Sequence, residues 1–321
     1  TYLPLLHTIH HMKCVEAARR GSVALFVIFF WLATLDERTT VSERKLSGAD
    51  MIKSARNNTC HPHVIFTTFM CPSPACTPLR QRIESNTRQV WSSMDRVEFK
   101  DVMTSSVNTN LYGMPYIGDM FTHMMDACPD ARTYTYINGD IIGTHGFIET
   151  IDAVLKIGEF LMVGRRTNVP WLETYDSTHE DFDFEAHFNR GELFLPNAID
   201  YFTITKSAID WDSTPPFVVG RAGYDNWLVE EMGWRNKKVA LVDATQTAQM
   251  IHQTDGGGQF SWGGGTAKEK ADELYNLRLA KAGNPRRRFA HGNTYNAEWE
   301  TVRDTAQGRI IVRHKQFKLV W

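Results

Sequence analysis

The sequence predicts an α/β protein with a mostly parallel sheet flanked by helices, preceded by an N-terminal anchor helix. Three observations support this class. The chain has 321 residues, enough for one large domain. Between residues 63 and 163, β-branched and aromatic runs alternate with runs of helical periodicity. That alternation is typical of βαβ units with right-handed crossovers. An uncharged apolar run also lies near the N-terminus.

The composition narrows the function classes. With 42% hydrophobic and 22% charged residues, the chain is an ordinary globular protein rather than a disordered one. The formal net charge is −2 at pH 7. Because neutralising phosphates requires a basic excess, this charge argues against a general nucleic-acid-binding protein.

The apolar run at residues 21–35 predicts a membrane anchor. Two arginines precede it and two acidic residues follow it. The run is short for a bilayer span and close to the core of a signal peptide, but its flanking charges favour an uncleaved signal anchor with a cytosolic N-terminus. A cleaved signal and a buried helix are the alternatives. We expect a cytosolic tail (1–20), the anchor (21–35), a polar stem (36–60) and one folded domain (61–321).

Cysteine usage is compatible with this topology. One cysteine precedes the anchor, and four follow it: Cys60, Cys71, Cys76 and Cys128. An even number on the lumenal side permits two disulfides without identifying their pairing. The short segment between Cys71 and Cys76 suits a small loop clasp, and its spacing is not that of a zinc site.

The folded part begins with two strands and two helices. Residues 63–69 (HVIFTTF) predict a buried strand from their β-branched and aromatic content. Residues 79–94 predict a helix, because their apolar residues recur on one face, and residues 96–102 a short strand. Within residues 111–125, a proline suits the first turn of a helix, and the spacing after it is helical.

Residues 133–143 (TYTYINGDIIG) are the central stretch of the chain. They predict a strand that ends at Asn138-Gly139-Asp140. An acidic residue at the end of a buried strand is well placed to hold a metal ion, whereas Asn-Gly between apolar runs is also typical of a hairpin turn. The amphipathic helix at 147–157 and the strand at 160–163 favour the site, because ligands of such sheets lie beyond the carboxyl ends of the strands.

The rest of the chain continues the same pattern. Strands are predicted at residues 200–205 and 239–244, and an extended turn with a strand at 215–221. A helix is predicted to start near residue 224, where Asp225 or Asn226 suits the cap, and another spans 268–282. The glycine-rich segment 256–265 between them suits a flexible loop or a mobile flap.

Several short segments together carry a resemblance to a known family. In chain order they are Thr67-Thr68-Phe69, Asn86, Trp91, Tyr136-Ile137-Asn138-Gly139-Asp140-Ile141, Val163-Gly164-Arg165-Arg166, Asp200-Tyr201-Phe202, Pro216-Phe217-Val218-Val219-Gly220-Arg221, Asp225-Asn226-Trp227-Leu228 and His252-Gln253. Their order and spacing resemble the GT-A glycosyltransferases, the nucleotide-diphospho-sugar transferase superfamily, and within it a glycosyltransferase-like branch. The resemblance extends from about His63 to Trp299 and implies a Rossmann-like GT-A domain.

On the donor side, the resemblance implies a site for a nucleotide-sugar and a divalent cation, Mn²⁺ or Mg²⁺. Asp140 is the expected first metal ligand, and His252 resembles the late histidine that contacts the metal or the diphosphate. Asn138 stands where the family's Asp-x-Asp motif has its first carboxylate, so one acidic ligand is missing. Thr67 and Thr68 end the first strand, where the family seats the nucleotide base. Without the resemblance, His252 is equally a core or capping histidine.

On the acceptor side, the resemblance implies a general base for the acceptor hydroxyl. Asp225 matches the family's acidic motif there; alone, it is equally a helix cap. Arg165, Arg166 and Arg221 suit phosphate or acceptor groups, because guanidinium binds such groups bidentately. For these arginines, a solvated surface position is the alternative.

The sequence thus predicts a membrane-anchored glycosyltransferase, a single-pass type II protein of the Golgi or ER membrane. It would move a sugar from a nucleotide-sugar to a hydroxyl on a glycan, protein or lipid. One rival is a sugar nucleotidyltransferase, but residues 71–80 lack the glycine and lysine that its signature loop would need. The other is a non-catalytic nucleotide- or glycan-binding protein, which the missing carboxylate at Asn138 favours.

Overall fold

The computed structural model describes residues 59–69, 77–170, 183–234, 238–254, 266–282 and 291–316. The predicted tail and anchor, nearly all of the stem, Cys71, Cys76 and the glycine-rich segment lie outside these residues. No helix within the described ranges is both long and apolar enough to cross a membrane. Residues 58–321 form a compact unit by themselves, and the fold below is that of this unit.

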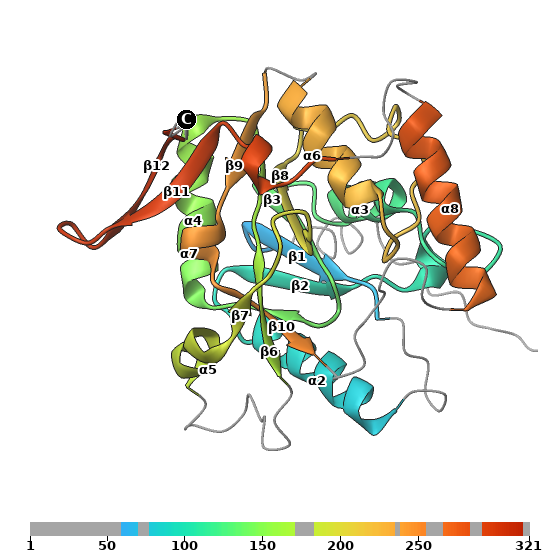
Figure 1. Ribbon diagram of the computed structural model, residues 1–321, viewed down its shortest axis with the longest axis horizontal. Coiled ribbons are helices and arrows are strands. Elements are labelled where there is room, and N and C mark those ends of the chain that lie inside the picture. The colour runs from blue at the N-terminus through green and yellow to red at the C-terminus, as the bar shows by residue number, and fades with distance from the viewer. Residues whose placement is uncertain are drawn as a thin grey trace, which may run out of the picture. The chain divides into compact units, whose positions relative to one another are not determined.

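An eight-stranded mixed sheet forms the centre of the domain (Figure 1). Its strand order is β12-β11-β9-β5-β8-β3-β1-β2. The strands are β1 (His63–Thr67), β2 (Val97–Asp101), β3 (Thr133–Ile137), β5 (Phe160–Val163), β8 (Tyr201–Thr205), β9 (Ala240–Asp243), β11 (Trp299–Asp304) and β12 (Arg309–His314). Strand β8 runs antiparallel to both of its neighbours, β3 and β5, and β12 is antiparallel to β11. The other neighbours are parallel.

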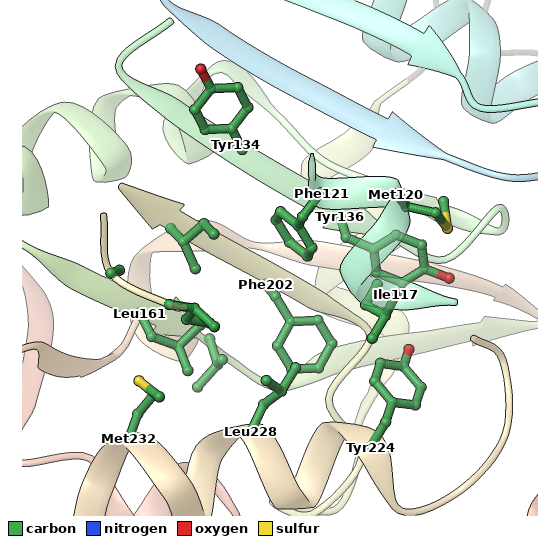
Figure 2. Packing of buried hydrophobic residues seen from close by; sticks show 14 of the residues in the cluster. Ile117, Met120, Phe121, Tyr134, Tyr136, Leu161, Phe202, Tyr224, Leu228 and Met232 are labelled. Atoms are coloured by element: carbon green, nitrogen blue, oxygen red, sulfur yellow. The ribbon is translucent and has the colours of Figure 1, made fainter. Parts of the chain in front are cut away.

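Helices cover both faces of this sheet. Helices α3 (Ile117–Ala127), α6 (Tyr224–Trp234) and α8 (Ala267–Ala282) contribute to one core. Helices α2 (Pro78–Ser92), α4 (His145–Val154) and α7 (Thr245–Ala248) contribute to the other. In β1, Val64 and Phe66 lie in the first core and Ile65 in the second, as the twofold alternation of a strand requires. Figure 2 shows the first core, where Phe121, Phe202 and Leu228 pack between sheet and helices.

A second, four-stranded sheet was not predicted from the sequence. Its order is β4-β10-β6-β7. The strands are β4 (Ile141–Ile142), β10 (Met250–Thr254), β6 (Arg166–Pro170) and β7 (Glu192–Leu193), and α5 (Phe184–Arg190) lies just before β7 in the chain. Strands β10 and β6 are parallel, and β4 and β7 pair antiparallel at the two edges. This sheet carries His252 on β10.

The hairpin interpretation of Asn138-Gly139 is wrong. The amide of Ile141 does donate to the carbonyl of Asn138 at 3.1 Å, which closes a tight turn. The following strand β4, however, pairs with β10 of the small sheet and not with β3. The turn therefore passes the chain from the large sheet to the small one and leaves Asp140 at the junction.

The strand predicted within residues 215–221 is absent. Val218 makes only an isolated bridge to Tyr116, because Pro215 and Pro216 lack the amide hydrogens that a ladder needs.

A disulfide joins Cys60 to Cys128 and fixes the start of β1 to the end of α3. Three short 3₁₀ helices, η1 (Thr104–Ser106), η2 (Leu155–Ile157) and η3 (Thr294–Asn296), complete the described elements.

Candidate functional site

Asp140 lies where the two sheets meet, between the end of β3 and the start of β4. Gly139 permits this sharp passage, because a Cβ at that position would lie 3.1 Å from a ring carbon of Phe69. The backbone of Asp140 is held by Gln253, whose amide donates to the Asp140 carbonyl at 3.0 Å. The Gln253 side chain in turn bonds Asn86 and Thr87 on α2 at 3.1 Å each. The position of Asp140 is thus fixed by both α2 and β10.

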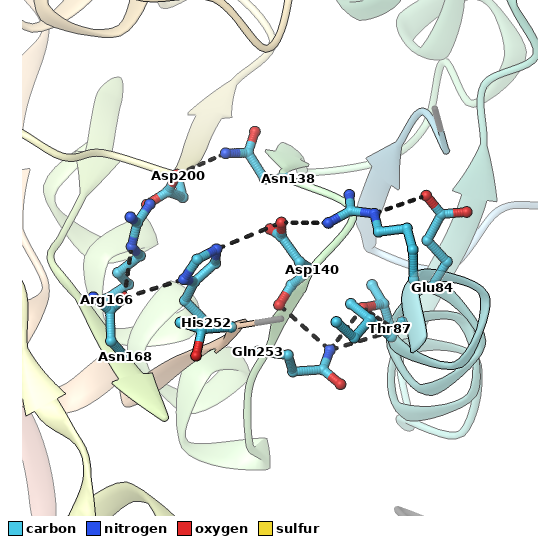
Figure 3. A network of polar contacts seen from close by, with 12 residues as sticks. Glu84, Thr87, Asn138, Asp140, Arg166, Asn168, Asp200, His252 and Gln253 are labelled. Atoms are coloured by element: carbon cyan, nitrogen blue, oxygen red, sulfur yellow. Dashed lines mark hydrogen bonds and ion pairs between the residues drawn. The ribbon is translucent and has the colours of Figure 1, made fainter. Parts of the chain in front are cut away.

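The Asp140 carboxylate has two cationic or basic neighbours (Figure 3). Its Oδ2 lies 3.0 Å from Nη1 of Arg80 and 3.5 Å from Nε2 of His252. Its Oδ1 is buried and has no hydrogen-bond partner among the described residues. Burial is the largest influence on the pKa of Asp140 and raises it, but His252 and Arg80 together lower the pKa well below its ordinary value. The carboxylate is therefore ionised at neutral pH.

The orientation of His252 follows from its partner on β6. The β10–β6 register places His252 beside Asn168, and the ring Nδ1 lies 3.1 Å from Asn168 Oδ1. The same oxygen accepts from Nε of Arg166 at 3.0 Å. Because a carboxamide oxygen only accepts, Nδ1 carries a hydrogen in this contact, and Nε2 is the ring nitrogen that faces Asp140. Metal-binding histidines are commonly held in this way through their other ring nitrogen.

Arg80 lies in the first turn of α2. This helix was predicted from the sequence, but Arg80 was not identified as a site residue. Its Nε lies 3.3 Å from Oε1 of Glu84, one helical turn further along. Arg80 thus bridges two carboxylates, Glu84 and Asp140. Burial, the largest influence, gives Glu84 a raised pKa despite the opposing effect of Arg80.

Asp200 forms the next part of the same network, just before β8. It accepts from Nδ2 of Asn138 at 2.6 Å and pairs with the Arg166 guanidinium. Asn138 Oδ1 accepts from the Tyr136 hydroxyl at 3.0 Å. Both ends of the Asn138 amide are therefore used within the protein, so Asn138 orients Asp200 rather than facing outward.

Asp225 lies in the first turn of α6, which begins at Tyr224, so neither Asp225 nor Asn226 is the cap that was predicted. The pKa of Asp225 is raised to about 7, chiefly by burial and further by the charge of Asp200, against hydrogen bonds from backbone amides. Tyr224 bonds the hydroxyl of Tyr136. The Asp225 carboxylate accepts from the Gly223 amide at 3.3 Å, and it is coupled by charge to Asp200, which belongs to the network that contains Asp140.

The other expected site residues fall into two groups. Thr67 and Thr68 are buried at the end of β1, and Thr67 Oγ1 lacks a hydrogen-bond partner among the described residues. A Cβ at Gly139 would lie 3.7 Å from this oxygen, so Thr67 adjoins the turn before Asp140. In contrast, the Arg165 side chain donates to the backbone carbonyls of Phe194 at 2.5 Å and Leu193 at 3.4 Å rather than to a side chain of the network.

Arg221 also lies apart from the network around Asp140. Its guanidinium faces two acidic residues of α8, with Nη2 3.7 Å from Glu269 and Nε 3.8 Å from Asp272. Arg166, the neighbour of Arg165, is the arginine that joins the network. Sequence reasoning missed Arg80, Glu84 and Asn168, because each is significant only through a partner far away in the chain.

Two of the groups around Asp140 are of kinds that can hold a divalent cation. Among the described residues, no three His, Cys, Asp or Glu side chains gather as a metal site. Two suitable groups nevertheless face each other: the ionised Asp140, with a buried and unpartnered oxygen, and His252 Nε2. When ionised, Asp140 and Glu84 outweigh Arg80 by one negative charge. An oxygen–imidazole pair of this kind suits Mn²⁺, and the carboxylate also suits Mg²⁺.

Comparisons with known proteins give little further guidance. No family model matches the chain, and no curated protein sequence matches it. One similar solved structure is the crystal structure of a glycosyltransferase involved in the glycosylation of the major capsid of PBCV-1. The match covers 67% of this chain and 98% of that chain, with 10% identity and a TM-score of 0.36. At this score the match carries no argument, and the function must be argued from the site.

Proposed function

We propose that this chain is a GT-A-like glycosyltransferase that moves a sugar from a nucleotide-sugar to an acceptor hydroxyl on a glycan, protein or lipid. One observation carries the proposal. A polar network contains the ionised Asp140 beside His252 at one end and Asp200 at the other, and the charge of Asp200 helps to raise the pKa of Asp225 to about 7. The first pair suits the diphosphate of a donor, and the Asp225 carboxyl suits an acceptor hydroxyl. The resemblance noted in the sequence assigns the same two sides.

At the donor end, Asp140 and His252 would hold Mn²⁺ or Mg²⁺. A bound divalent cation offsets the negative charge that builds on the diphosphate as the bond to the anomeric carbon breaks. Thr67 and Thr68 would face the nucleotide base, and the unsatisfied Thr67 hydroxyl next to Gly139 supports this role. Asn138 keeps Asp200 in place through its amide.

At the acceptor end, Asp225 would act as the general base. The acceptor oxygen forms a bond to the anomeric carbon, the bond from that carbon to the diphosphate oxygen breaks, and the hydroxyl proton passes to the Asp225 carboxylate. A base works best when its pKa lies near the working pH, and a value of about 7 meets this condition. The negative charge of Asp200 contributes to that value.

The test is nucleoside diphosphate release from a panel of nucleotide-sugars, with and without Mn²⁺. We expect release with one class of donor, loss of release in Asp140→Asn, and unchanged release in Asp101→Asn. Asp101 is a suitable control because it forms a surface ion pair with Arg88 at 3.1 Å, with both side chains more than a third exposed. Release from no donor, or full release in Asp140→Asn, would overturn the proposal.

A second candidate is a non-catalytic nucleotide- or glycan-binding protein. The observation that favours it is Asn138, which replaces a carboxylate and spends both ends of its amide on Tyr136 and Asp200. Such a protein would bind a nucleoside diphosphate in the presence of Mn²⁺ and release nothing from any donor. The same panel therefore separates the two functions.

We also propose that the domain faces the secretory lumen, as a single-pass type II protein of the Golgi or ER membrane anchored through residues 21–35. The Cys60–Cys128 disulfide supports this location, because disulfides persist mainly in oxidising compartments. Protease digestion of sealed microsomes tests it. The domain should survive until detergent is added, and digestion without detergent would place it on the cytosolic side.

A further inference from the structure

The two oxygens of the Asp140 carboxylate have unequal surroundings. Oδ2 meets both Arg80 and His252, whereas Oδ1 is buried and lacks a hydrogen-bond partner among the described residues. An unsatisfied carboxylate oxygen is costly inside a protein unless a further ligand reaches it. The protein's own groups thus satisfy one oxygen of the carboxylate and leave the other without a partner among the described residues.

Arg80 is held at this place by its two carboxylate partners rather than by its helix. It lies in the first turn of α2, where its amide donates to the Thr77 cap at 3.2 Å. The helix dipole disfavours a positive charge at a helix N-terminus. Asp140 and Glu84 must therefore supply the attraction. The side chain of Arg80 remains 19% exposed, against 6% for Asp140.

We propose that Arg80 is an internal counter-ion that competes with a divalent cation for Asp140. The inference rests on the cation site of the proposed function. Two cations on one carboxylate repel each other strongly in a site of low dielectric. Arg80 therefore gives up Oδ2 when the cation arrives and keeps its pair with Glu84. Its planar fork matches phosphate oxygens, so the freed guanidinium is available to a diphosphate.

This competition makes a cation and a nucleoside diphosphate mutually reinforcing ligands. Each cation that binds frees Arg80, and a diphosphate that holds Arg80 leaves Asp140 to the cation. In the absence of both, the pair between Arg80 and Asp140 keeps the buried carboxylate neutralised. Arg80 is thus a regulating residue, which acts through Asp140, rather than a group that takes part in bond breaking.

Mn²⁺ affinity without any nucleotide tests the proposal, with free Mn²⁺ measured by electron paramagnetic resonance. Arg80→Gln removes the competing charge and should bind Mn²⁺ about tenfold more tightly than the wild type. Arg80→Lys keeps the charge and should stay within about twofold of the wild type. Arg88→Gln is the matched control on the same helix, because Arg88 is exposed and pairs with Asp101 instead. Asp140→Asn should abolish the binding.

Unchanged or weaker Mn²⁺ binding in Arg80→Gln would overturn the proposal, as would the absence of Mn²⁺ binding in both proteins. The experiment contains no nucleotide-sugar, so it tests the competition for Asp140 even if the protein transfers no sugar. A second arm adds uridine or guanosine diphosphate, whose enhancement of Mn²⁺ affinity should shrink in Arg80→Gln.

If Arg80→Gln does not fold, the competition can be tested by NMR in the wild-type protein. In ¹⁵N-arginine-labelled protein, the Arg80 Nε–H signal, identified through Arg80→Lys, should shift on Mg²⁺ titration. A signal that stays in place while Mg²⁺ binds would contradict the competition.

Discussion

His252 and Asp140 face each other because the register of the small sheet places them together. Strand β10 pairs with β4 so that His252 lies opposite Ile141, the residue directly after Asp140. This brings His252 Nε2 to 3.5 Å from Asp140 Oδ2. A ladder of backbone hydrogen bonds, rather than a flexible loop, thus sets the spacing of the two expected metal ligands. Rigid placement of this kind is what a functional pair requires.

Replacing His252 by alanine should remove most of the Mn²⁺-dependent part of nucleotide binding. Asn168→Ala should weaken it by about tenfold, because the ring would lose the partner that orients Nε2. Titration calorimetry of a nucleoside diphosphate at saturating Mn²⁺ measures both. His145→Ala, an exposed histidine at the start of α4, is the control. Unchanged affinity in His252→Ala would return this residue to a purely structural role.

The rate of transfer should depend on pH through Asp225. A general base must be deprotonated, so kcat/KM should rise with pH, about tenfold per unit, until pH passes about 7. The variant Asp225→Asn should lose this rise of kcat/KM with pH, and its rate of transfer should fall much more than its affinity for the donor. Asp200→Asn removes a negative charge that raises the pKa of Asp225, so the rise of kcat/KM should occur at lower pH in this variant. If kcat/KM still rose with pH in Asp225→Asn, another group would be responsible for the pH dependence.

The sequence predicted those parts of the fold around Asp140 that depend on neighbouring residues. The strand before Asp140 was predicted because its apolar pattern and the following Asn-Gly are local signals. The small sheet was missed because β6 (RTNVP) and β10 (MIHQT) contain several polar residues and pair across a long stretch of chain. The Arg80–Asp140 pair could not be predicted either, because the two residues are 60 positions apart and nothing in the helix sequence identifies the partner of Arg80. The prediction at 215–221 erred because β-branched residues alone do not make a strand next to two prolines.

Acid should destabilise the fold through His63, a fully buried residue at the start of β1. Its Nδ1 lies 3.0 Å from Thr133 Oγ1, and its Nε2 lies 3.4 Å from Asp152. Burial, the largest cause, lowers the pKa of His63 from 6.5 to about 4, while Asp152 opposes the shift and Arg96 adds to it.

The sign of this effect follows from the proton uptake of the two states. Between pH 6.5 and about 4, the unfolded chain binds a proton that the folded protein does not. The free energy of unfolding should therefore fall as pH drops through this window, by up to about 3 kcal/mol, and this contribution should level off below pH 4. Urea unfolding at several pH values measures it. His63→Gln should flatten the dependence, and an unaltered slope in that variant would refute the assignment.

The Cys60–Cys128 disulfide should stabilise the domain without shaping its site. The bridge joins positions 68 residues apart, and a closure of this length contributes about 2–4 kcal/mol. It lies before the start of β1, whereas Asp140 follows the end of β3; because β1 and β3 are parallel, these are opposite edges of the sheet. The double variant Cys60→Ser/Cys128→Ser should lose that stability in urea and still bind nucleotide. Two free thiols at Cys60 and Cys128, found by alkylation of the unreduced, unfolded protein, would contradict the pairing.

The most direct test of the central claim is the melting temperature of the protein against a panel of nucleoside diphosphates, with and without Mn²⁺. A ligand that binds only the folded state raises the melting temperature. We predict a rise with one nucleotide that requires Mn²⁺ and is absent in Asp140→Asn. The variant itself should melt only slightly below the wild type, because Arg80 keeps Glu84 as a partner. A panel in which no nucleotide moves the melting temperature, with or without Mn²⁺, would contradict a nucleotide-sugar site at Asp140.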